Sequence, residues 1–173
     1  MSIFTLYPKI AYKVNEYDYL RAIDITQSVK IKSFLKDYRG ISYNPYTVKD
    51  GERPDYVAHK FYGDSNLDWV ILLSNDIYNI YDEWPRNSVD FEEYLIEKYD
   101  SIANTLTTVK YYYNANKDII DLTTYNSLSA SARSSETIYE YELRANNNKS
   151  KIRLIRPSII GGIQTELKSL LYK

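Results

Sequence analysis

The chain has 173 residues, of which 44% are apolar and 26% are charged, and its formal net charge is −1. These values are ordinary for a globular protein with one sizeable core, or for a small module with elaborations around it. The absence of cysteine excludes disulfides and thiolate metal sites, and the lack of a basic excess argues against nucleic acid as the main partner.

No segment has the pattern of a targeting or membrane element. Residues 1–13 lack a charged start followed by a long apolar run, so we expect no secretory signal. No stretch approaches the roughly 20 apolar residues that a membrane helix requires, so we expect no membrane partner.

Residues 1–45 are predicted to form an extended arm and strands with little helix. β-Branched residues alternate with polar ones at Ile23, Ile25, Val29 and Ile31, which favours strands. Pro8 interrupts any strand ladder, and no segment before it could pair with it. We therefore expect an arm that packs on another chain, with Tyr7 among its contacts. A frayed terminus is the alternative.

A short module is predicted to begin at Tyr46. A strand at Tyr46–Val48 and a turn at Asp50–Gly51 lead to Pro54, which suits the first position of a helix because its missing N–H would be unpaired there. Apolar residues at helical spacing continue to Gly63, which stops the helix.

A second helix is predicted over residues 65–74 from its apolar face. Trp69 lies inside an apolar run, so a core position is the expectation. Trp84 precedes a proline and follows acidic residues, and the sequence leaves open whether it faces the core or a partner.

Three further elements are expected after the module. A helix begins with Ser88 as its cap and ends near Asp100. Strands are predicted at Thr107–Tyr113 and Ile119–Ile120 on either side of a turn. Residues 123–136 are small and polar, which predicts an exposed loop with room for one helical turn.

The last part of the chain is predicted to contain a hairpin and a helix. Thr137–Leu143 and Lys151–Ile155 alternate apolar with charged residues. Asn146–Asn148 between them tolerates positive φ, which favours a tight turn. From about Ser158 a closing helix is predicted, with Leu167 on its apolar face.

Charge is divided into two opposed blocks. Residues 76–100 hold eight acidic and two basic groups, and residues 144–173 hold seven basic and one acidic group. These blocks could pair within the fold or meet complementary blocks on neighbouring subunits.

No arrangement of residues indicates catalysis. His59 is the single histidine, and without a cysteine or a second histidine it cannot build a common zinc site. Acidic pairs such as Asp82–Glu83 could hydrolyse glycosides only at a defined separation, and they lie among many other charges. The five glycines form no phosphate-binding loop. We therefore predict no enzyme activity, no metal and no cofactor.

The order strand, helix, glycine break, helix resembles that of a LysM module. Tyr46–Lys49 with Asp50–Gly51 resembles the opening strand and turn of that module, and Asn75 matches its characteristic Asn.

A narrower resemblance is to the baseplate wedge protein 53 family of contractile-tailed bacteriophages. Six short segments resemble that family in order and spacing: Asp24–Thr26, Gly51–Pro54, Tyr62–Asp64, Leu67–Leu73, Glu83–Pro85 and Ile152–Pro157.

The resemblance implies a structural subunit of the virion tail baseplate that is assembled in the host cytoplasm. It would be a wedge component, in six copies per baseplate, that clamps neighbouring wedges around the central hub through protein–protein contacts. The many tyrosines suit such contacts, because a Tyr ring can be wet in a free subunit and buried in a complex, although an A- and T-rich genome would give the same bias. The candidate interaction residues are Tyr7, Glu52, Arg53, His59, Asp82, Glu83, Trp84, Arg153 and Arg156.

The alternative function is a cell-wall module, because LysM modules as a class bind N-acetylglucosamine polymers. Here Glu52, Arg53 and Pro54 replace the Asp-Thr-Leu common in sugar-binding members, which argues against direct peptidoglycan binding. A cell-wall hydrolase would need a catalytic domain that the remaining residues do not form.

The predicted fold class is therefore α+β, with a small LysM-like βααβ module and strand-rich extensions at both ends. The segments are residues 1–45, the module and following helix at 46–100, and hairpins and a helix at 101–173. A LysM unit needs a second strand antiparallel to its first, and Lys151–Ile155, which ends just before a proline, has that character. We expect it to pair beside Tyr46–Val48, with residues 86–150 as an insertion, since loop-closure cost grows only with the logarithm of length.

Overall fold

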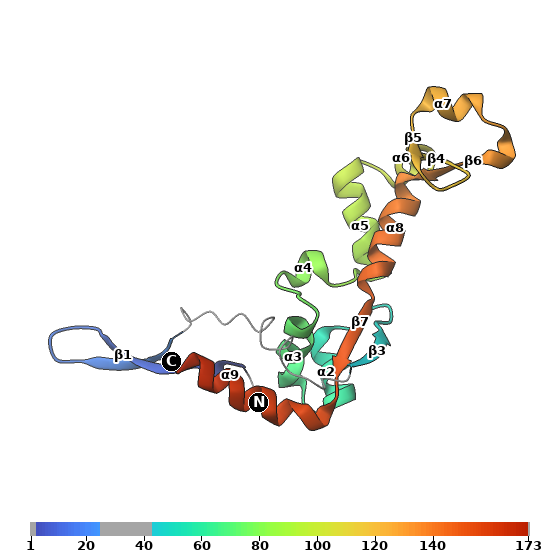
Figure 1. The fold of residues 1–173 in the computed structure, drawn as a ribbon. Coiled ribbons are helices and arrows are strands. Elements are labelled where there is room, and N and C mark those ends of the chain that lie inside the picture. The colour runs from blue at the N-terminus through green and yellow to red at the C-terminus, as the bar shows by residue number, and fades with distance from the viewer. Residues whose placement is uncertain (1–2, 25–42, 173) are drawn as a thin grey trace. The chain divides into compact units, whose positions relative to one another are not determined.

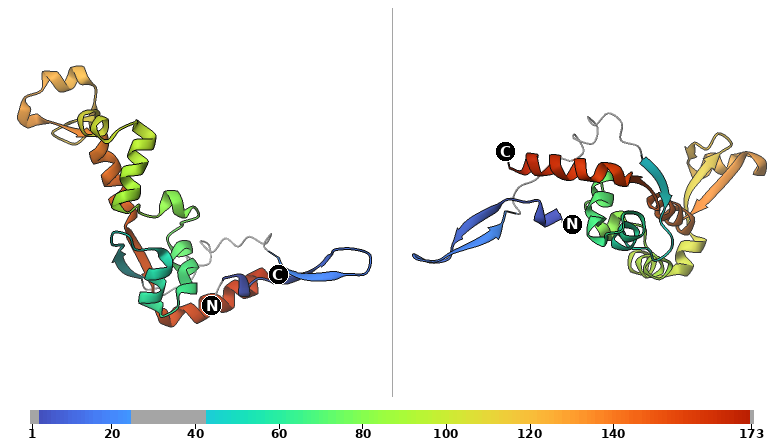
Figure 2. Two further views of the ribbon diagram at one scale, coloured as in Figure 1. Left: turned by 180° about the vertical axis from the view of Figure 1, so that it is seen from behind. Right: turned by 90° about the horizontal axis from the view of Figure 1, so that it is seen from below.

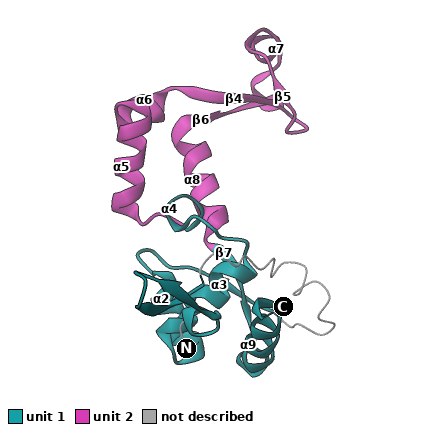
Figure 3. Cartoon of the chain, turned by 90° about the vertical axis from the view of Figure 1, so that its left-hand side faces the viewer, with its two compact units in different colours: residues 1–84, 151–173 teal, residues 85–150 magenta. Residues whose placement is uncertain are grey.

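The computed structural model describes residues 3–24 and 43–172, and it divides into two compact units (Figures 1 and 3). Unit 1 comprises residues 1–84 and 151–173, and unit 2 comprises residues 85–150. These units divide the chain differently from the three sequence segments, because the last strand and helix group with the module.

The elements of both units mix helices with antiparallel strand pairs, which confirms the α+β class. Unit 1 contains η1 (Ile3–Thr5), β1 (Lys9–Lys13), β2 (Tyr19–Ile23), β3 (Tyr43–Thr47), α2 (Pro54–Tyr62), η2 (Ser65–Leu67), α3 (Asp68–Ser74), α4 (Ile80–Glu83), β7 (Lys151–Ile155) and α9 (Pro157–Leu171). Unit 2 contains α5 (Ser88–Tyr99), α6 (Ile102–Thr107), β4 (Val109–Asn114), β5 (Ile119–Ile120), α7 (Leu122–Ser127), η3 (Ala130–Ala132), β6 (Arg133–Thr137) and α8 (Ile138–Lys149).

The strand that closes the module comes from the far end of the chain, as predicted. β3 pairs antiparallel with β7, and Tyr46 lies opposite Ile152 while Thr47 lies opposite Lys151. Unit 2 is inserted between α4 and β7. A βααβ arrangement is therefore present in unit 1, and its likeness to LysM modules rests on the sequence resemblance.

The predicted signals at the ends of the first module helix are also confirmed. Pro54 occupies the first turn of α2, and Gly63 ends the helix with φ 78°. A left-handed backbone of this kind is strained for residues with a side chain, which explains the glycine.

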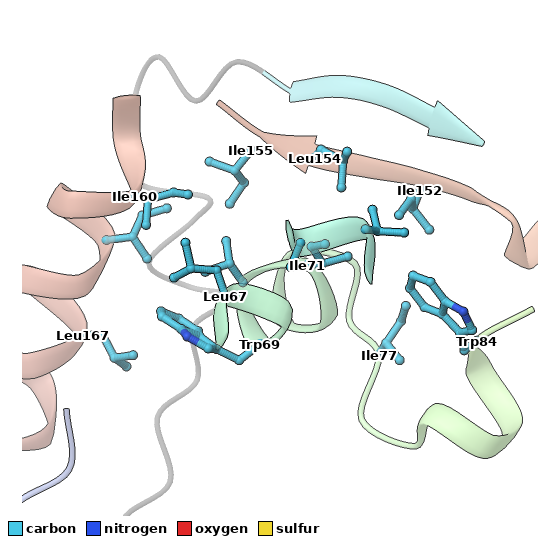
Figure 4. Packing of buried hydrophobic residues seen from close by; sticks show 14 of the residues in the cluster. Leu67, Trp69, Ile71, Ile77, Trp84, Ile152, Leu154, Ile155, Ile160 and Leu167 are labelled. Atoms are coloured by element: carbon cyan, nitrogen blue, oxygen red, sulfur yellow. The ribbon is translucent and has the colours of Figure 1, made fainter. Parts of the chain in front are cut away.

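The core of unit 1 lies between the β3–β7 pair and helices α2, α3 and α9 (Figure 4). β7 contributes Ile152 and Leu154, which face Ile71 of α3, and α9 contributes Leu167 among others. Trp69 is 6% exposed, which confirms the expected core position.

Both outer edges of the β3–β7 pair are protected from further strand pairing. The side chain of Asn75 binds the backbone N–H and C=O of Arg153 in β7. Pro45 lies opposite Arg153, so it faces the outer edge of β3, where it has no N–H to offer. Such devices prevent edge-to-edge association.

The N-terminal segment differs from the predicted arm. β1 pairs with β2 in a hairpin, with Tyr12 opposite Leu20 (Figure 2), so the strand after Pro8 does have a partner. Before the hairpin, Leu6 is 4% exposed and joins the core of unit 1. The expected strand residues Ile25, Val29 and Ile31 lie outside the described residues.

Unit 2 combines α5, α6 and α8 with the three-stranded sheet β5–β4–β6. α5 has the predicted range, with Asn87 rather than Ser88 as its cap. The strands at Val109–Asn114 and Ile119–Ile120 are confirmed. The predicted loop at residues 123–136 is wrong in part, because it contains most of α7 and most of β6, which pairs with β4.

The predicted hairpin after Thr137 is wrong, because Ile138–Lys149 is a helix. Thr137 and Glu140 form a capping box, in which each side chain accepts from the backbone N–H of the other residue. The buried side chain on this helix is Glu142, which lies on the charged side of the alternating pattern. The alternation therefore did not mark a buried strand face.

Candidate protein-binding surfaces

Glu52, a candidate interaction residue, is the centre of a hydrogen-bonded cluster within unit 1. Its Oε2 accepts from the Tyr46 hydroxyl at 2.7 Å and from the Lys49 backbone N–H at 2.9 Å. Its Oε1 accepts from Lys60 Nζ at 3.0 Å. Burial alone would raise the pKa of Glu52. The hydrogen bonds from these donors lower the pKa by more than burial raises it, so the pKa lies below its ordinary value. The carboxylate holds the turn before α2.

Trp84 belongs to the core of unit 1. It is 6% exposed, and its Nε1 donates to the backbone oxygen of Glu52 at 2.9 Å (Figure 4). This contact joins two candidate residues from distant parts of the sequence. It also decides between the two possibilities for Trp84, because a buried ring is not available to a partner.

Asp82 and Glu83 order the turn around α4. Glu83 Oε2 accepts from the backbone N–H of Tyr78 and of Asn79, at 2.6 and 2.9 Å. Asp82 Oδ2 accepts from Asn79 Nδ2 at 2.6 Å. Both side chains therefore have a local structural role.

The other candidates lie on separate parts of unit 1. Arg53 is 82% exposed and 3.3 Å from Asp55. His59 is exposed on α2, and Arg156 is exposed at the start of α9. The Arg153 guanidinium lies over the ring of Tyr43 at 5.1 Å.

Tyr7 is half-buried and packs against the core of unit 1. Its ring centroid is 6.3 Å from that of Phe4. The candidate residues therefore do not form one patch on unit 1. The role of the exposed candidates in partner contacts stays a prediction.

A surface that the sequence interpretation missed is the β1–β2 hairpin. Paired residues of adjacent strands share a face of the sheet. One face, here called the basic face, carries Lys9, Ala11, Lys13, Tyr19, Arg21 and Ile23. The other, called the apolar face, carries Ile10, Tyr12, Leu20 and Ala22. All residues of both strands are exposed.

A sequence signal for this hairpin does exist. Asn15 Oδ1 accepts from the backbone N–H of Tyr17 and of Asp18, at 2.9 and 2.8 Å, which is a side-chain turn typical of Asn. Alternating residues flank that turn on both sides, as in other hairpins.

Unit 2 contains its own buried ionic cluster around Glu142. Glu142 Oε1 accepts from the Tyr99 hydroxyl at 2.6 Å and from Lys98 Nζ at 3.1 Å, and Lys110 Nζ lies 3.5 Å away. Burial alone would raise the pKa of Glu142. The Tyr99 hydroxyl and the two lysine cations lower the pKa by more than burial raises it, so the pKa lies below its ordinary value. The cluster joins α5, β4 and α8.

The exposed side of α5 is acidic. Val89, Glu92, Glu93, Ile96 and Glu97 are all exposed, and at 3.6 residues per turn they fall on one side of the helix. Phe91 and Leu95 are buried on the opposite side. We call the exposed side the acidic face of α5.

Within residues 3–24 and 43–172, no three His, Cys, Asp or Glu side chains are placed to hold a metal ion together. In the same ranges, no helix is both long enough and apolar enough to cross a membrane.

The sequence matches a protein-family model and is similar to a known phage protein. The family model described as base plate wedge protein 53 matches residues 2–128. The baseplate wedge protein gp53 of Enterobacteria phage T4 is 29% identical over 83 residues, which is 48% of this chain and 41% of that protein. The chain therefore aligns with less than half of this relative. Since the family model covers most of the sequence, the chain belongs to the base plate wedge protein 53 family.

Proposed function

We propose that the chain is a structural, non-enzymatic subunit of a contractile phage tail baseplate. As a wedge component it joins neighbouring wedges around the central hub through protein–protein contacts. Six copies per baseplate and assembly in the host cytoplasm complete the proposal, which has the family match as its starting point.

The observation that carries the proposal is the exposed β1–β2 hairpin. Tyr12 is 63% exposed and Leu20 is 62% exposed, although they face each other across the two strands. A two-stranded hairpin is marginally stable in water unless another layer covers it. Leu6 fixes the segment before the hairpin in the core of unit 1, so the hairpin is an anchored element with an uncovered surface. Such an element is one that a neighbouring subunit can bind.

The experiment mixes the purified chain with the wedge proteins of its own phage and sizes the products by chromatography with light scattering. A Tyr12→Ser/Leu20→Ser variant removes apolar side chains from the hairpin without touching either core. An Ile119→Ser variant is the control, because Ile119 is also exposed but lies in unit 2.

We expect the unchanged chain and the Ile119→Ser variant to co-elute with at least one wedge protein, and the hairpin variant to bind at least ten-fold more weakly. The proposal fails if the unchanged chain binds none of them. It loses its structural basis if the hairpin variant binds as well as the control.

Direct peptidoglycan binding is not part of the proposal. The backbone oxygen of Glu52 accepts from Trp84, and the Glu52 carboxylate is held by Tyr46, Lys49 and Lys60. These groups are therefore occupied by the chain itself rather than free for sugar hydroxyls. Retention of the chain on insoluble peptidoglycan at physiological salt would favour the glycan-binding alternative.

A further inference from the structure

The basic face of the hairpin has no acidic side chain on it. Lys9, Lys13 and Arg21 are interleaved with Ala11, Tyr19 and Ile23. Lys9 and Lys13 lie four residues apart, which is about 13 Å along a strand. A surface that complements this face must carry carboxylates and apolar side chains over a similar length.

The acidic face of α5 has this character. Val89 and Ile96 are 63% and 49% exposed and lie two helical turns apart. Glu92, Glu93 and Glu97 flank them, and none of these carboxylates pairs with another residue in the described part of the chain. From Val89 to Glu97 the face is about 12 Å long.

We propose that the basic face of the hairpin in one copy of this chain binds the acidic face of α5 in a second copy. The two faces match in the sign of their charge, in length and in the alternation of charged with apolar side chains. The inference rests on the proposed function, because it specifies one contact between neighbouring subunits.

The contact joins two different surfaces, one from unit 1 and one from unit 2. Such a head-to-tail contact repeats from copy to copy and can close into a ring. Its charged side chains are exposed, so the attraction between them is weak and is screened by salt. The contact therefore forms when copies are held side by side and contributes little association in dilute solution.

Disulfide trapping tests this contact cleanly, because the chain contains no cysteine. One full-length variant carries Ala11→Cys at the centre of the basic face, and a second carries Ile96→Cys on the acidic face. They are mixed at high concentration and low salt under mild oxidation. The matched control pairs Ala11→Cys with Ile119→Cys, which is exposed in unit 2 away from α5.

We expect the first pair to give at least five-fold more mixed disulfide than the control pair, and we expect 1 M NaCl to remove the difference. Adding Lys13→Glu to the first protein, or Glu93→Lys to the second, reduces trapping to the control level. The two charge reversals together restore it. Equal trapping in both pairs, or no restoration by the double reversal, overturns the inference.

A chain that carries both Ala11→Cys and Ile96→Cys distinguishes contact between copies from contact within one copy. At high dilution it remains reduced if the contact is between copies. Rapid closure within a monomer overturns the inference. The wedge-binding experiment is independent, so loss of trapping with retained wedge binding refutes this contact and leaves the proposed function intact.

Discussion

The side-chain amide of Asn75 bonds both the backbone N–H and the backbone C=O of Arg153, although the two residues are 78 positions apart. Asn75 Nδ2 donates to the Arg153 carbonyl at 2.8 Å, and the Arg153 backbone N–H donates to Asn75 Oδ1 at 2.8 Å. The same Nδ2 donates to the Ile71 carbonyl at 2.8 Å. One side chain therefore ties the end of α3 to the strand that returns after unit 2.

Replacing Asn75 by Ala should reduce the free energy of unfolding by about 1–3 kcal/mol, because the backbone groups of Arg153 lose their partners. Chemical denaturation followed by circular dichroism measures this change. Asn126→Ala is the control, since Asn126 is exposed on α7, and it should change stability by less than about 0.5 kcal/mol. Equal effects of the two substitutions would show that the Asn75 contacts contribute nothing.

Replacing Trp69 by Ala should cost roughly 3–5 kcal/mol, because it leaves a cavity in the core of unit 1. Tyr81→Ala is the matched surface control, since Tyr81 is 87% exposed. Differential scanning calorimetry should show a lower melting temperature for the first variant and little change for the second. An unchanged melting temperature for Trp69→Ala would contradict its placement in the core.

The free energy of unfolding should depend on pH through the ionisation of Glu142. Its pKa is lowered in the folded chain, so its contribution is fully present above the unfolded pKa of about 4.3 and is lost as pH falls through the folded value. Glu142→Gln should therefore destabilise the chain at pH 7 by about 1–3 kcal/mol, the range for an unsatisfied buried group.

The difference between Glu142→Gln and the unchanged chain should narrow as pH falls below the unfolded pKa of about 4.3. The carboxylate is then protonated first in the unfolded chain and, at lower pH, in the folded chain. Urea unfolding at pH 7 and at pH 3.5 measures it. Glu97→Gln, on the exposed side of the same region, serves as control. A difference that is independent of pH would show that the charge of Glu142 is not the stabilising feature.

The isolated chain should be cut by trypsin first within the hairpin. Lys9, Lys13 and Arg21 are exposed there, and an uncovered two-stranded hairpin opens readily. Mass spectrometry of early fragments identifies the sites. Resistance of the hairpin in the free chain, with earlier cuts in α2 or α3, would contradict this prediction.

The free chain should also be monomeric or only weakly self-associating. The edges of the β3–β7 pair are blocked by Pro45 and by Asn75, and the proposed contact between copies is weak. Sedimentation equilibrium at micromolar concentration should give the mass of one chain, 20.4 kDa. A stable dimer under these conditions would contradict the prediction.

The parts of the fold that were predicted correctly have strong local or pairwise signals. Pro54 and Gly63 mark the ends of α2 through backbone chemistry that few other residues provide. The β3–β7 pairing was predicted because Ile152–Pro157 has an alternating pattern that ends at a proline. Neither signal depends on the long insertion between the strands.

The errors arose where tertiary packing decides between helix and strand. Ile138–Lys149 alternates in sequence, yet the capping box at Thr137 starts a helix and Glu142 is buried among Lys98, Tyr99 and Lys110. The buried position is charged, so a hydrophobic pattern could not reveal it. Trp84 was also undecided, because the Glu52 oxygen that accepts from it is 32 positions away in sequence.

Reconstitution of the baseplate wedge proteins of the same phage, viewed by electron microscopy, tests the central claim most directly. With the unchanged chain or the Ile119→Ser control, wedges should join into closed rings that contain the chain. With the Tyr12→Ser/Leu20→Ser variant, they should remain as separate wedges. Rings that form equally well without the chain, or with the hairpin variant, would contradict the account.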